Sequence, residues 1–289
     1  MTDIGFIGLG VMGAPMAGHL LTAGHRLHIS TRTRNAATDD LVQRGAQWLT
    51  SPAAVAQASE VVFTIVGMPH DVEAVYFSDN GLLRGMQPGS VLVDMTTSSP
   101  ELASRIAAAA RERGGSALDA PVSGGDSGAR AGSLSIMVGG DSASFERILP
   151  LLRLLGHNIV HQGPAGAGQH CKLCNQITIA GTMLGVCEAM AYARASGLDP
   201  ERALASIGSG AAGSWALSNL APKMLRHDYA PGFVVRHFIK DMGLATEAAE
   251  AHQLTLPALQ LALQRYRELA DEGREFDGTQ ALFRLYNPD

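Results

Sequence analysis

Lysine is scarce in this sequence, which has three lysines, Lys172, Lys223 and Lys240, against nineteen arginines. A guanidinium stays protonated in any protein environment, whereas an ammonium can lose its proton when burial or a nearby charge lowers its pKa. A site whose proton donor must also act as a base can therefore use lysine but not arginine. A general preference for arginine would also leave a few lysines by chance, so the neighbours of each lysine must decide whether it has a chemical role.

Aromatic residues and long apolar runs are also in short supply. Aromatics make up 5% of the chain, so its cores must be built from Ala, Val, Leu, Ile and Met. No apolar run approaches the ~20 residues of a membrane span. The net charge of -5 and the pI near 6.0 argue against nucleic acid as the main partner. Without a basic leader or cleavage site at its N-terminus, the sequence favours a cytoplasmic protein with no membrane partner.

The three cysteines, Cys171, Cys174 and Cys187, lie in one segment. An odd number of cysteines without a secretory signal speaks against a disulfide framework. Cys171 and Cys174 have the spacing of a redox motif, but they lie inside a long helical pattern, and no second Cys or His pair completes a metal site. We therefore expect structural cysteines and no bound metal.

A glycine-rich motif near the N-terminus is the strongest local signal. Residues 3–7 predict a short buried strand, and Gly8-Leu9-Gly10-Val11-Met12-Gly13 follows at once, before a helical pattern. Gly8 would make the tight turn, Gly10 would let the backbone approach a pyrophosphate, and Gly13 would allow close helix–strand packing. The free N–H groups of the helix N-terminus would then bind the phosphates. The motif predicts a dinucleotide-binding domain.

The turn after the second expected strand, residues 26–30, bears on the choice of dinucleotide. It reads Thr31-Arg32-Thr33-Arg34, where an NAD site usually has an acid for the ribose 2′-hydroxyl. Two hydroxyls and two guanidinium groups suit a 2′-phosphate instead. We expect NADP, with Thr31 and Arg32 as contacts, and NAD remains open if this is only a solvated basic turn.

The alternation of strands and helices continues to about residue 163. Further strands are expected near 60–66, 90–95, 116–122, 134–139 and 158–161. Ligands lie at the carboxyl ends of such strands, so Val66, Met68 and Thr97 are candidate walls of the cofactor site. These patterns predict an α/β fold, with a Rossmann domain over residues 1–163.

A second glycine-rich segment, Ser123-Gly124-Gly125, leaves one of these strands. Its hydroxyl and backbone N–H groups could form a nest that holds a carboxylate. An ordinary mobile loop running to Gly132 is an equally good interpretation of this segment alone.

A long helical stretch, residues 168–196, follows a Gly/Pro-rich boundary and opens the second domain. Lys172, Asn175 and Gln176 share one face of it, and this polar cluster is costly to bury unless it meets a ligand. Helical patterns then dominate, so we expect an all-helical domain over residues 164–289. The expected helices are 200–208, 214–226, 236–252 and 257–272.

Four motifs together resemble the β-hydroxyacid dehydrogenase family, which includes 3-hydroxyisobutyrate dehydrogenase, 2-hydroxy-3-oxopropionate (tartronate semialdehyde) reductase and 6-phosphogluconate dehydrogenase relatives. The motifs are Gly8-Leu9-Gly10-Val11-Met12-Gly13, Asp119-Ala120-Pro121-Val122-Ser123-Gly124-Gly125, Gly168-Gln169-His170-Cys171-Lys172-Leu173-Cys174-Asn175-Gln176 and Lys240-Asp241-Met242-Gly243-Leu244-Ala245. Their order and spacing cover essentially the whole chain.

The resemblance implies roles for individual residues. Lys172 would be the general acid/base. Lys240, with Phe233 nearby, would lie at the cofactor–substrate cleft. The substrate carboxylate and hydroxyl would be held by Ser123, Gly124, Gly125 and Asn175, with Gln176 beside them. Family members also pair their helical domains, which implies a homodimer or homotetramer.

The implied reaction is hydride transfer between a nicotinamide and a short β-hydroxyacid or its semialdehyde. The arginine turn favours 2-hydroxy-3-oxopropionate reductase over 3-hydroxyisobutyrate dehydrogenase, with other short aldehyde-acid reductases as alternatives. An imine reductase shares the fold but typically lacks the lysine found at Lys172, and a non-catalytic NADP-binding module has no need of it. His170 and His237 are rival proton donors that we interpret as structural.

Overall fold

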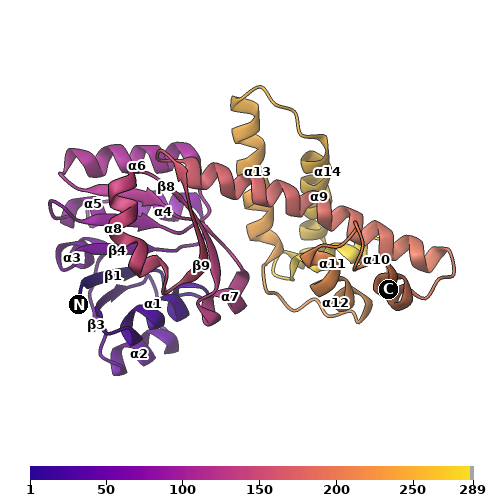
Figure 1. Ribbon diagram of the computed structural model, residues 1–289, viewed down its shortest axis with the longest axis horizontal. Helices are drawn as coiled ribbons and strands as arrows, with labels where there is room; N and C mark the ends of the chain where they lie inside the picture. Colours follow the sequence, from indigo (N-terminus) through magenta and orange to yellow (C-terminus); the bar gives the residue numbers. More distant parts are fainter. Residues whose placement is uncertain (287–289) are drawn as a thin grey trace. The chain divides into compact units, whose positions relative to one another are not determined.

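The computed structural model describes residues 1–286, in two compact units that meet at Lys172 and Leu173. The first unit is an α/β domain and the second is helical (Figure 1). The division falls within the long helix α9 (Ala167–Ala195). The expected fold class, a Rossmann domain and a helical domain joined by a long helix, is confirmed.

The first unit is built on a mixed sheet in the order β3-β2-β1-β4-β5-β6-β8-β7, with β9 also paired to β8. The strands from β3 to β6 are parallel, whereas β8 is antiparallel to β6 and β7. The strands are β1 (Asp3–Ile7), β2 (Arg26–Ser30), β3 (Gln47–Trp48), β4 (Val61–Thr64), β5 (Val91–Asp94), β6 (Ser116–Asp119), β7 (Val122–Ser123), β8 (Leu134–Gly139) and β9 (Gly156–Gly163).

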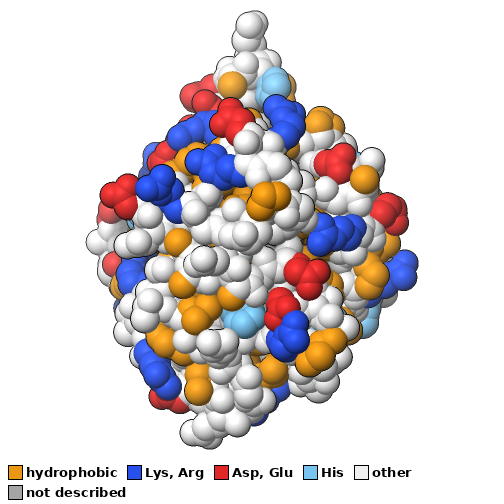
Figure 2. Space-filling model, turned by 90° about the vertical axis from the view of Figure 1, so that its left-hand side faces the viewer, with side chains coloured by type: hydrophobic (Ala, Val, Ile, Leu, Met, Phe, Trp, Pro, Cys, Tyr) orange, Lys and Arg blue, Asp and Glu red, His pale blue; other side chains and the backbone are white. Residues whose placement is uncertain are grey.

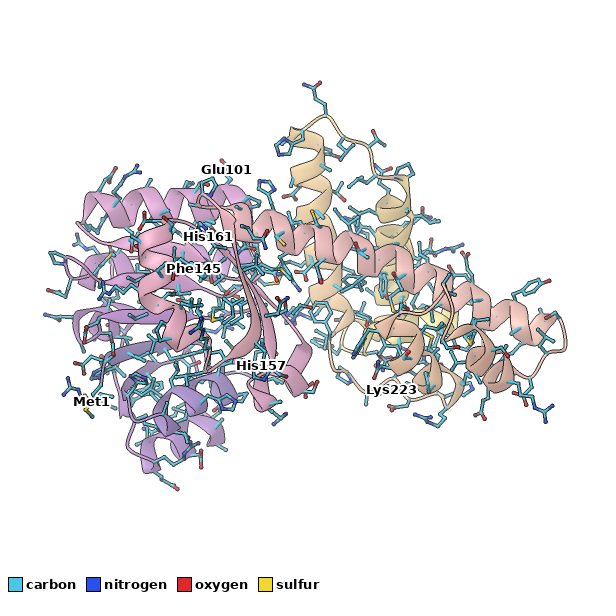
Figure 3. The ribbon with its side chains drawn as sticks, in the orientation of Figure 1. Met1, Glu101, Phe145, His157, His161 and Lys223 are labelled. Carbon is cyan, nitrogen blue, oxygen red and sulfur yellow. The ribbon has the colours of Figure 1, made fainter. Side chains whose placement is uncertain are left out.

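Helices cover both faces of this sheet. They are α1 (Gly13–Thr22), α2 (Ala36–Gln43), α3 (Pro52–Gln57), α4 (Pro69–Phe77), α5 (Leu82–Gly85), α6 (Pro100–Glu112), α7 (Gly125–Ala131) and α8 (Ser142–Leu152). Side chains alternate along a strand, so Val61 and Phe63 of β4 join a core cluster with α1 and α8, while Val62 joins another with α3 to α6. Figure 3 shows Phe145 of α8 beside His161 of β9, with ring centroids 5.1 Å apart. Burial on both faces explains why these strands read as continuous apolar runs.

Polar caps followed by proline set where several helices begin. Ser51 accepts a hydrogen bond from Ala54 N at 3.2 Å, and Ser99 accepts one from Leu102 N at 3.0 Å. In each case a proline occupies the first helical position, where its missing N–H costs nothing. α6 therefore starts directly after the loop that leaves β5.

The second unit contains the rest of α9 and a set of shorter helices. These are α10 (Pro200–Ile207), α11 (Trp215–Asn219), α12 (Ala221–Leu225), α13 (Val235–Ala251) and α14 (Pro257–Leu269), followed by a π-helical turn (Ala270–Arg274) and a 3-10 helix (Thr279–Leu285). In its core, Phe238 packs edge-on against Tyr266 at 5.0 Å, and the Tyr266 hydroxyl donates to Thr279 O at 2.8 Å. Among the described residues, no helix combines the length and apolarity required for a membrane span.

Three local predictions were wrong. The expected helix 214–226 is split into α11 and α12, because Pro222 lies at the start of α12 and cannot continue the preceding ladder. The helix expected to 272 ends at Leu269, before a π-helical turn in which Gly273 has a φ of 78°. The mobile loop to Gly132, one of two interpretations of the segment after Ser123, is instead helix α7, which ends at Gly132 in the left-handed conformation.

The surface mixes charges of both signs. Figure 2 shows basic and acidic side chains interspersed over the face that it presents, without a broad area of one sign. Exposed ion pairs such as Arg105 with Glu73, 2.9 Å apart, are consistent with this pattern.

Candidate cofactor and catalytic site

The glycine turn after β1 has the space that a bound pyrophosphate needs. Gly8 has a φ of 90°, and a Cβ there would lie 2.1 Å from Ile65 O. A Cβ on Gly13 would lie 1.9 Å from Gly8 O, so both positions require glycine for close backbone packing. A Cβ on Gly10 would meet nothing within 4 Å, which leaves open space in front of the loop. These residues fit a dinucleotide.

The other residues of this turn divide between core and surface. Leu9 is 1% exposed and belongs to the core, whereas Val11 is 66% exposed. Met12 is half-buried and precedes α1, whose N-terminus carries partial positive charge. Leu9 thus anchors the turn, and the exposed backbone beyond it is available to phosphate.

The turn after β2 offers one well-exposed guanidinium. The Arg32 side chain is 88% exposed and lies 3.3 Å from Asp71 Oδ1, while Thr31 beside it is half-buried. Arg34 is engaged elsewhere, because its Nε donates to Asp39 at 2.6 Å and its guanidinium lies over Trp48. Arg32 is therefore the arginine of this turn best placed to meet a phosphate.

Asn35 links the two turns and had no role in the sequence-based prediction. Its side chain caps α2 by accepting from Thr38 N at 3.0 Å and donates to Leu9 O at 3.3 Å. An Asn that precedes a helix is recognisable as a cap, but its second bond to a turn 26 residues away is not legible from the sequence.

The predicted walls of the cofactor site lie at the carboxyl ends of β4 and β5. Val66 N donates to Thr96 Oγ1 at 3.0 Å, which ties the two strand ends together. Met68 is the N-cap of α4, and its N–H donates to Asp71 at 3.1 Å. Thr97 follows Thr96 and is half-buried. The structure thus brings Val66 and Thr97 to adjacent strand ends.

The glycine-rich segment after β6 lies between strand β7 and helix α7. Ser123 pairs with Ser135 of β8, and Gly124, with a φ of 134°, is the N-cap of α7. Gly125 has a φ of 63°, so consecutive residues adopt conformations that favour glycine. Successive backbone N–H groups in such a turn form a concave surface suited to an anion.

A buried carboxylate fixes the start of α9. Asp119, at the end of β6, accepts from Gly166 N and Gln169 N, each at 2.8 Å. Burial raises the pKa of Asp119, against the opposing effect of these N–H donors. Both Asp119 and Gln169 lie in motifs noted from the sequence, but no role was predicted for either.

Lys172 lies one turn beyond Gln169 on the same helix and is 7% exposed. Lysine is almost never this buried unless it is paired or functional. Its environment differs from that of Lys223 on α12, whose side chain is 36% exposed and 3.8 Å from Asp228. His170 is exposed and faces another side of α9.

In the second unit, a series of side-chain hydrogen bonds links Asn175 and Gln176 to Asp241, for which the sequence predicted no role. Asn175 Nδ2 donates to Gln176 Oε1 at 2.7 Å, and Gln176 Nε2 donates to Asp241 Oδ2 at 2.6 Å. The other oxygen of Asp241, which is 2% exposed, lies 2.6 Å from Lys240 Nζ. The sequence showed Lys240 and Asp241 side by side, but not that the carboxylate reaches α9.

Phe233 and His237, both considered from the sequence, lie just before α13 and at its start. The Phe233 ring is 5.9 Å from that of Phe238 and is 38% exposed. Burial lowers the pKa of His237, and the charges of Lys240 and Arg236 lower it further. A histidine with a lowered pKa is neutral near pH 7, which disfavours His237 as a proton donor there.

An open hollow of about 550 Å³ between α13 and α14 does not suit a carboxylated substrate. Its lining is acidic and carries a single arginine. The residues are Gly243, Thr246, Glu247, Glu250, Gln260, Leu263, Gln264, Arg267, Glu268 and Asp271. Like charges repel a substrate anion.

Known families match both parts of the chain. Residues 3–163 match the NAD binding domain of 6-phosphogluconate dehydrogenase, and residues 166–286 match the NAD-binding domain of NADP-dependent 3-hydroxyisobutyrate dehydrogenase. Among solved structures, Mycobacterium tuberculosis 3-hydroxyisobutyrate dehydrogenase with L-serine aligns with a TM-score of 0.91 at 31% identity, over 99% of each chain.

Curated relatives match over nearly their full length. An uncharacterised oxidoreductase of Bacillus subtilis is 54% identical, with 98% of each chain covered. An NAD-dependent L-serine dehydrogenase of Pseudomonas aeruginosa is 42% identical over 98% of each chain, and 2-hydroxy-3-oxopropionate reductase of Escherichia coli is 42% identical over 93% of this chain and 92% of its own. The resemblance inferred from the motifs is confirmed: this chain is an NAD(P)-dependent oxidoreductase that belongs to the β-hydroxyacid dehydrogenase family.

Proposed function

We propose that this protein is an NADPH-dependent reductase of a short semialdehyde that carries a carboxylate, with 2-hydroxy-3-oxopropionate as the preferred substrate. The observation that carries the reaction type is Lys172, a buried lysine in a chain that has three lysines against nineteen arginines. It lies one turn beyond the start of α9, which hydrogen bonds to Asp119 hold in place. The 42% identical Escherichia coli reductase supports the substrate.

The proposed chemistry divides between the cofactor and the chain. When bound, the reduced nicotinamide supplies the hydride that the aldehyde carbon receives. Lys172 Nζ, as an ammonium, donates a proton to the aldehyde oxygen as negative charge develops there. In the reverse direction the neutral amine of Lys172 removes the hydroxyl proton, which is the step that an arginine cannot perform.

Substrate orientation is assigned to two groups of residues. The N–H groups of Gly124 and Gly125, with the Ser123 hydroxyl, would hold the carboxylate. Asn175, whose amide is held by Gln176, would bind the reacting oxygen. Fixing both ends of a small substrate makes hydride transfer effectively intramolecular.

The cofactor preference rests on Arg32. Its exposed guanidinium and the hydroxyl of Thr31 suit a 2′-phosphate. The match of residues 166–286 to a domain of NADP-dependent 3-hydroxyisobutyrate dehydrogenase also supports NADP. The NAD-dependent Pseudomonas aeruginosa relative makes NADH the alternative to be tested.

Oxidation of L-serine is the second candidate, because that relative is an L-serine dehydrogenase and the aligned Mycobacterium tuberculosis structure contains L-serine. L-Serine is itself a β-hydroxyacid and would place its hydroxyl and carboxylate on the same groups. 3-Hydroxyisobutyrate dehydrogenase activity is the alternative that the sequence left open.

A substrate panel tests these assignments. NADPH and NADH oxidation are measured with 2-hydroxy-3-oxopropionate, methylmalonate semialdehyde, succinic semialdehyde and glyoxylate. NADP⁺ and NAD⁺ reduction are measured with L-serine and 3-hydroxyisobutyrate. We expect the highest kcat/KM for NADPH with 2-hydroxy-3-oxopropionate. A higher value with any other pair overturns the substrate or cofactor assignment, and no turnover with any of them overturns the proposal.

A further inference from the structure

The side-chain amide of Gln169 is fully buried, and both its nitrogen and its oxygen form hydrogen bonds. Its Nε2 donates to Thr96 O at 2.8 Å, and its Oε1 accepts from Ser98 N at 2.9 Å. These bonds span 73 and 71 residues of sequence and lie wholly within the first unit. Gln169 therefore bridges the first turn of α9 to the loop between β5 and α6.

Contacts with strands β6 and β8 fix the position of the turn that carries Gln169. Its own N–H donates to Asp119 at 2.8 Å. A Cβ on the preceding Gly168 would lie 2.4 Å from Met137 O, so α9 begins in direct backbone contact with β8. This turn cannot shift without breaking buried hydrogen bonds, each of which is costly to leave unmade.

The loop on the other side of the bridge is the predicted cofactor wall. Thr96 N donates to Asp94 Oδ1 at 3.0 Å, and Thr96 Oγ1 accepts from Val66 N at 3.0 Å. Thr97, a candidate cofactor contact, lies between the two residues that Gln169 binds. Two hydrogen bonds thus connect this loop directly to Gln169.

We propose that Gln169 is a positioning residue that couples the cofactor loop, residues 96–98, to the helical turn carrying Lys172. Lys172 lies three residues after Gln169, and in a helix such residues are neighbours on one face. The bridge holds the proton-transfer group in register with the loop that contacts the dinucleotide. The inference rests on the proposed function for the role of Lys172, but not for the coupling itself.

The chemistry of the bridge explains why an amide is needed. It must donate to a carbonyl and accept from an N–H at the same time, which a glutamine does with its two ends. Both oxygens of a carboxylate are acceptors, so the oxygen that replaces Nε2 would repel Thr96 O. A protonated carboxyl group again has one donor and one acceptor. Gln169→Glu therefore restores the bridge only when its side chain is protonated.

The coupling is tested first without turnover, by hydrogen–deuterium exchange with and without NADPH. In the wild type we expect NADPH to slow exchange in two peptides, one over residues 94–99 and one over residues 165–173. In Gln169→Leu, protection of the first peptide should remain while that of the second is lost. Equal protection of both peptides in the variant overturns the proposal.

Kinetics provide the second test, with NADPH deuterated at the transferred position. We expect kcat of Gln169→Leu to fall roughly 10- to 100-fold, as for small misplacements of reacting groups, and its isotope effect to rise because hydride transfer becomes more rate-limiting. A loss of folded enzyme lowers kcat but leaves the isotope effect unchanged, and that result would reject a positioning role.

Gln169→Glu keeps the proposal testable if the leucine variant does not fold. Its kcat relative to wild type should increase as the pH falls, since protonation restores the donor, and a flat ratio contradicts the coupling. Ser104→Ala is the matched control, because Ser104 Oγ bonds Ala165 O at 3.2 Å beside α9 without touching the cofactor loop. Absence of turnover in all proteins would count against the proposed function, while the exchange experiment would still decide the coupling.

Discussion

At the scale of single residues, the charge of Lys172 can be kept while its proton transfer is removed. Lys172→Arg leaves a cation that does not deprotonate, so we expect kcat to fall by about 10²–10⁴-fold. Initial rates with 2-hydroxy-3-oxopropionate measure the loss, and fluorescence titration should show NADPH binding retained. Lys223→Arg, at a partly exposed site on α12, is the matched control with near-normal turnover. Comparable rates for the two variants would remove Lys172 from the mechanism.

The proposed role of Arg32 in cofactor choice can be tested in a similarly direct way. Arg32→Ala removes one charged hydrogen-bond donor from the 2′-phosphate, which corresponds to a loss of roughly 10- to 100-fold in kcat/KM for NADPH. The value for NADH, which lacks that phosphate, should change little. Arg105→Ala serves as control, because Arg105 pairs with Glu73 on the surface. A parallel loss with both cofactors would show that Arg32 does not read the phosphate.

At the scale of secondary-structure elements, the hydrogen bond from Gln176 to Asp241 joins α9 to α13 within the second unit. Asp241→Asn leaves Lys240 buried without its carboxylate, so we expect the free energy of unfolding to fall by about 3–5 kcal/mol. Urea denaturation followed by circular dichroism measures this. Asp228→Asn alters the more accessible, partly exposed pair with Lys223 and should change the free energy by less than about 1 kcal/mol. Equal effects of the two substitutions would mean that burial of the α13 pair is unimportant.

β1 and β2 are joined at their starts by an acid-sensitive pair. Hydrogen bonds from Arg26, with a smaller contribution from His28, lower the pKa of Asp3 to about 2. A lowered folded-state pKa stabilises the fold above the ordinary value of 3.8, and this contribution is lost as the pH falls toward 2. Asp3→Asn should therefore reduce the dependence of the unfolding free energy on pH between about 4 and 2.

Urea denaturation of wild type and Asp3→Asn at several pH values in this range measures the difference. The two proteins should differ most at the upper end of this range and converge as the pH falls below about 2, where Asp3 becomes protonated in both states. Parallel curves would show that the pair between β1 and β2 does not stabilise the fold. The exposed position makes the expected difference small, because solvent screens such pairs.

At the scale of the whole molecule, the sequence predicted the strands, turns and helices that depend on local residue patterns. Buried strands such as β1 and β8, the glycine turn and α9 follow from hydrophobic runs, glycines and helical periodicity. Short strands such as β3 were missed, because two residues carry no periodic signal. α7 was missed because its Gly/Ser/Ala composition is typical of a loop as much as of a helix.

The functional site could be predicted only in part from the sequence, for a related reason. Lys172 and Gly10 stand out because their residue types are chemically distinctive in their motifs. Gln169, Asp119 and Asp241 act through partners far along the chain, at separations such as the 65 residues between Gln176 and Asp241. Such long-range hydrogen bonds arise from the packing of strands and helices, which one sequence does not reveal.

The differing exposure of the lysines has a spectroscopic consequence. Lys172 is 7% exposed, and the side chains of Lys240 and Lys223 are 9% and 36% exposed. Figure 3 labels Lys223, which lies on α12. Enzyme grown with ¹⁵N-lysine would give one side-chain resonance for each of these environments, without the overlap that a lysine-rich enzyme suffers. Solvent exchange would separate the Lys223 signal from the two buried ones, and Lys172→Arg would assign the rest. The protonation of the proposed catalytic amine can thus be followed directly by NMR as cofactor and substrate are added.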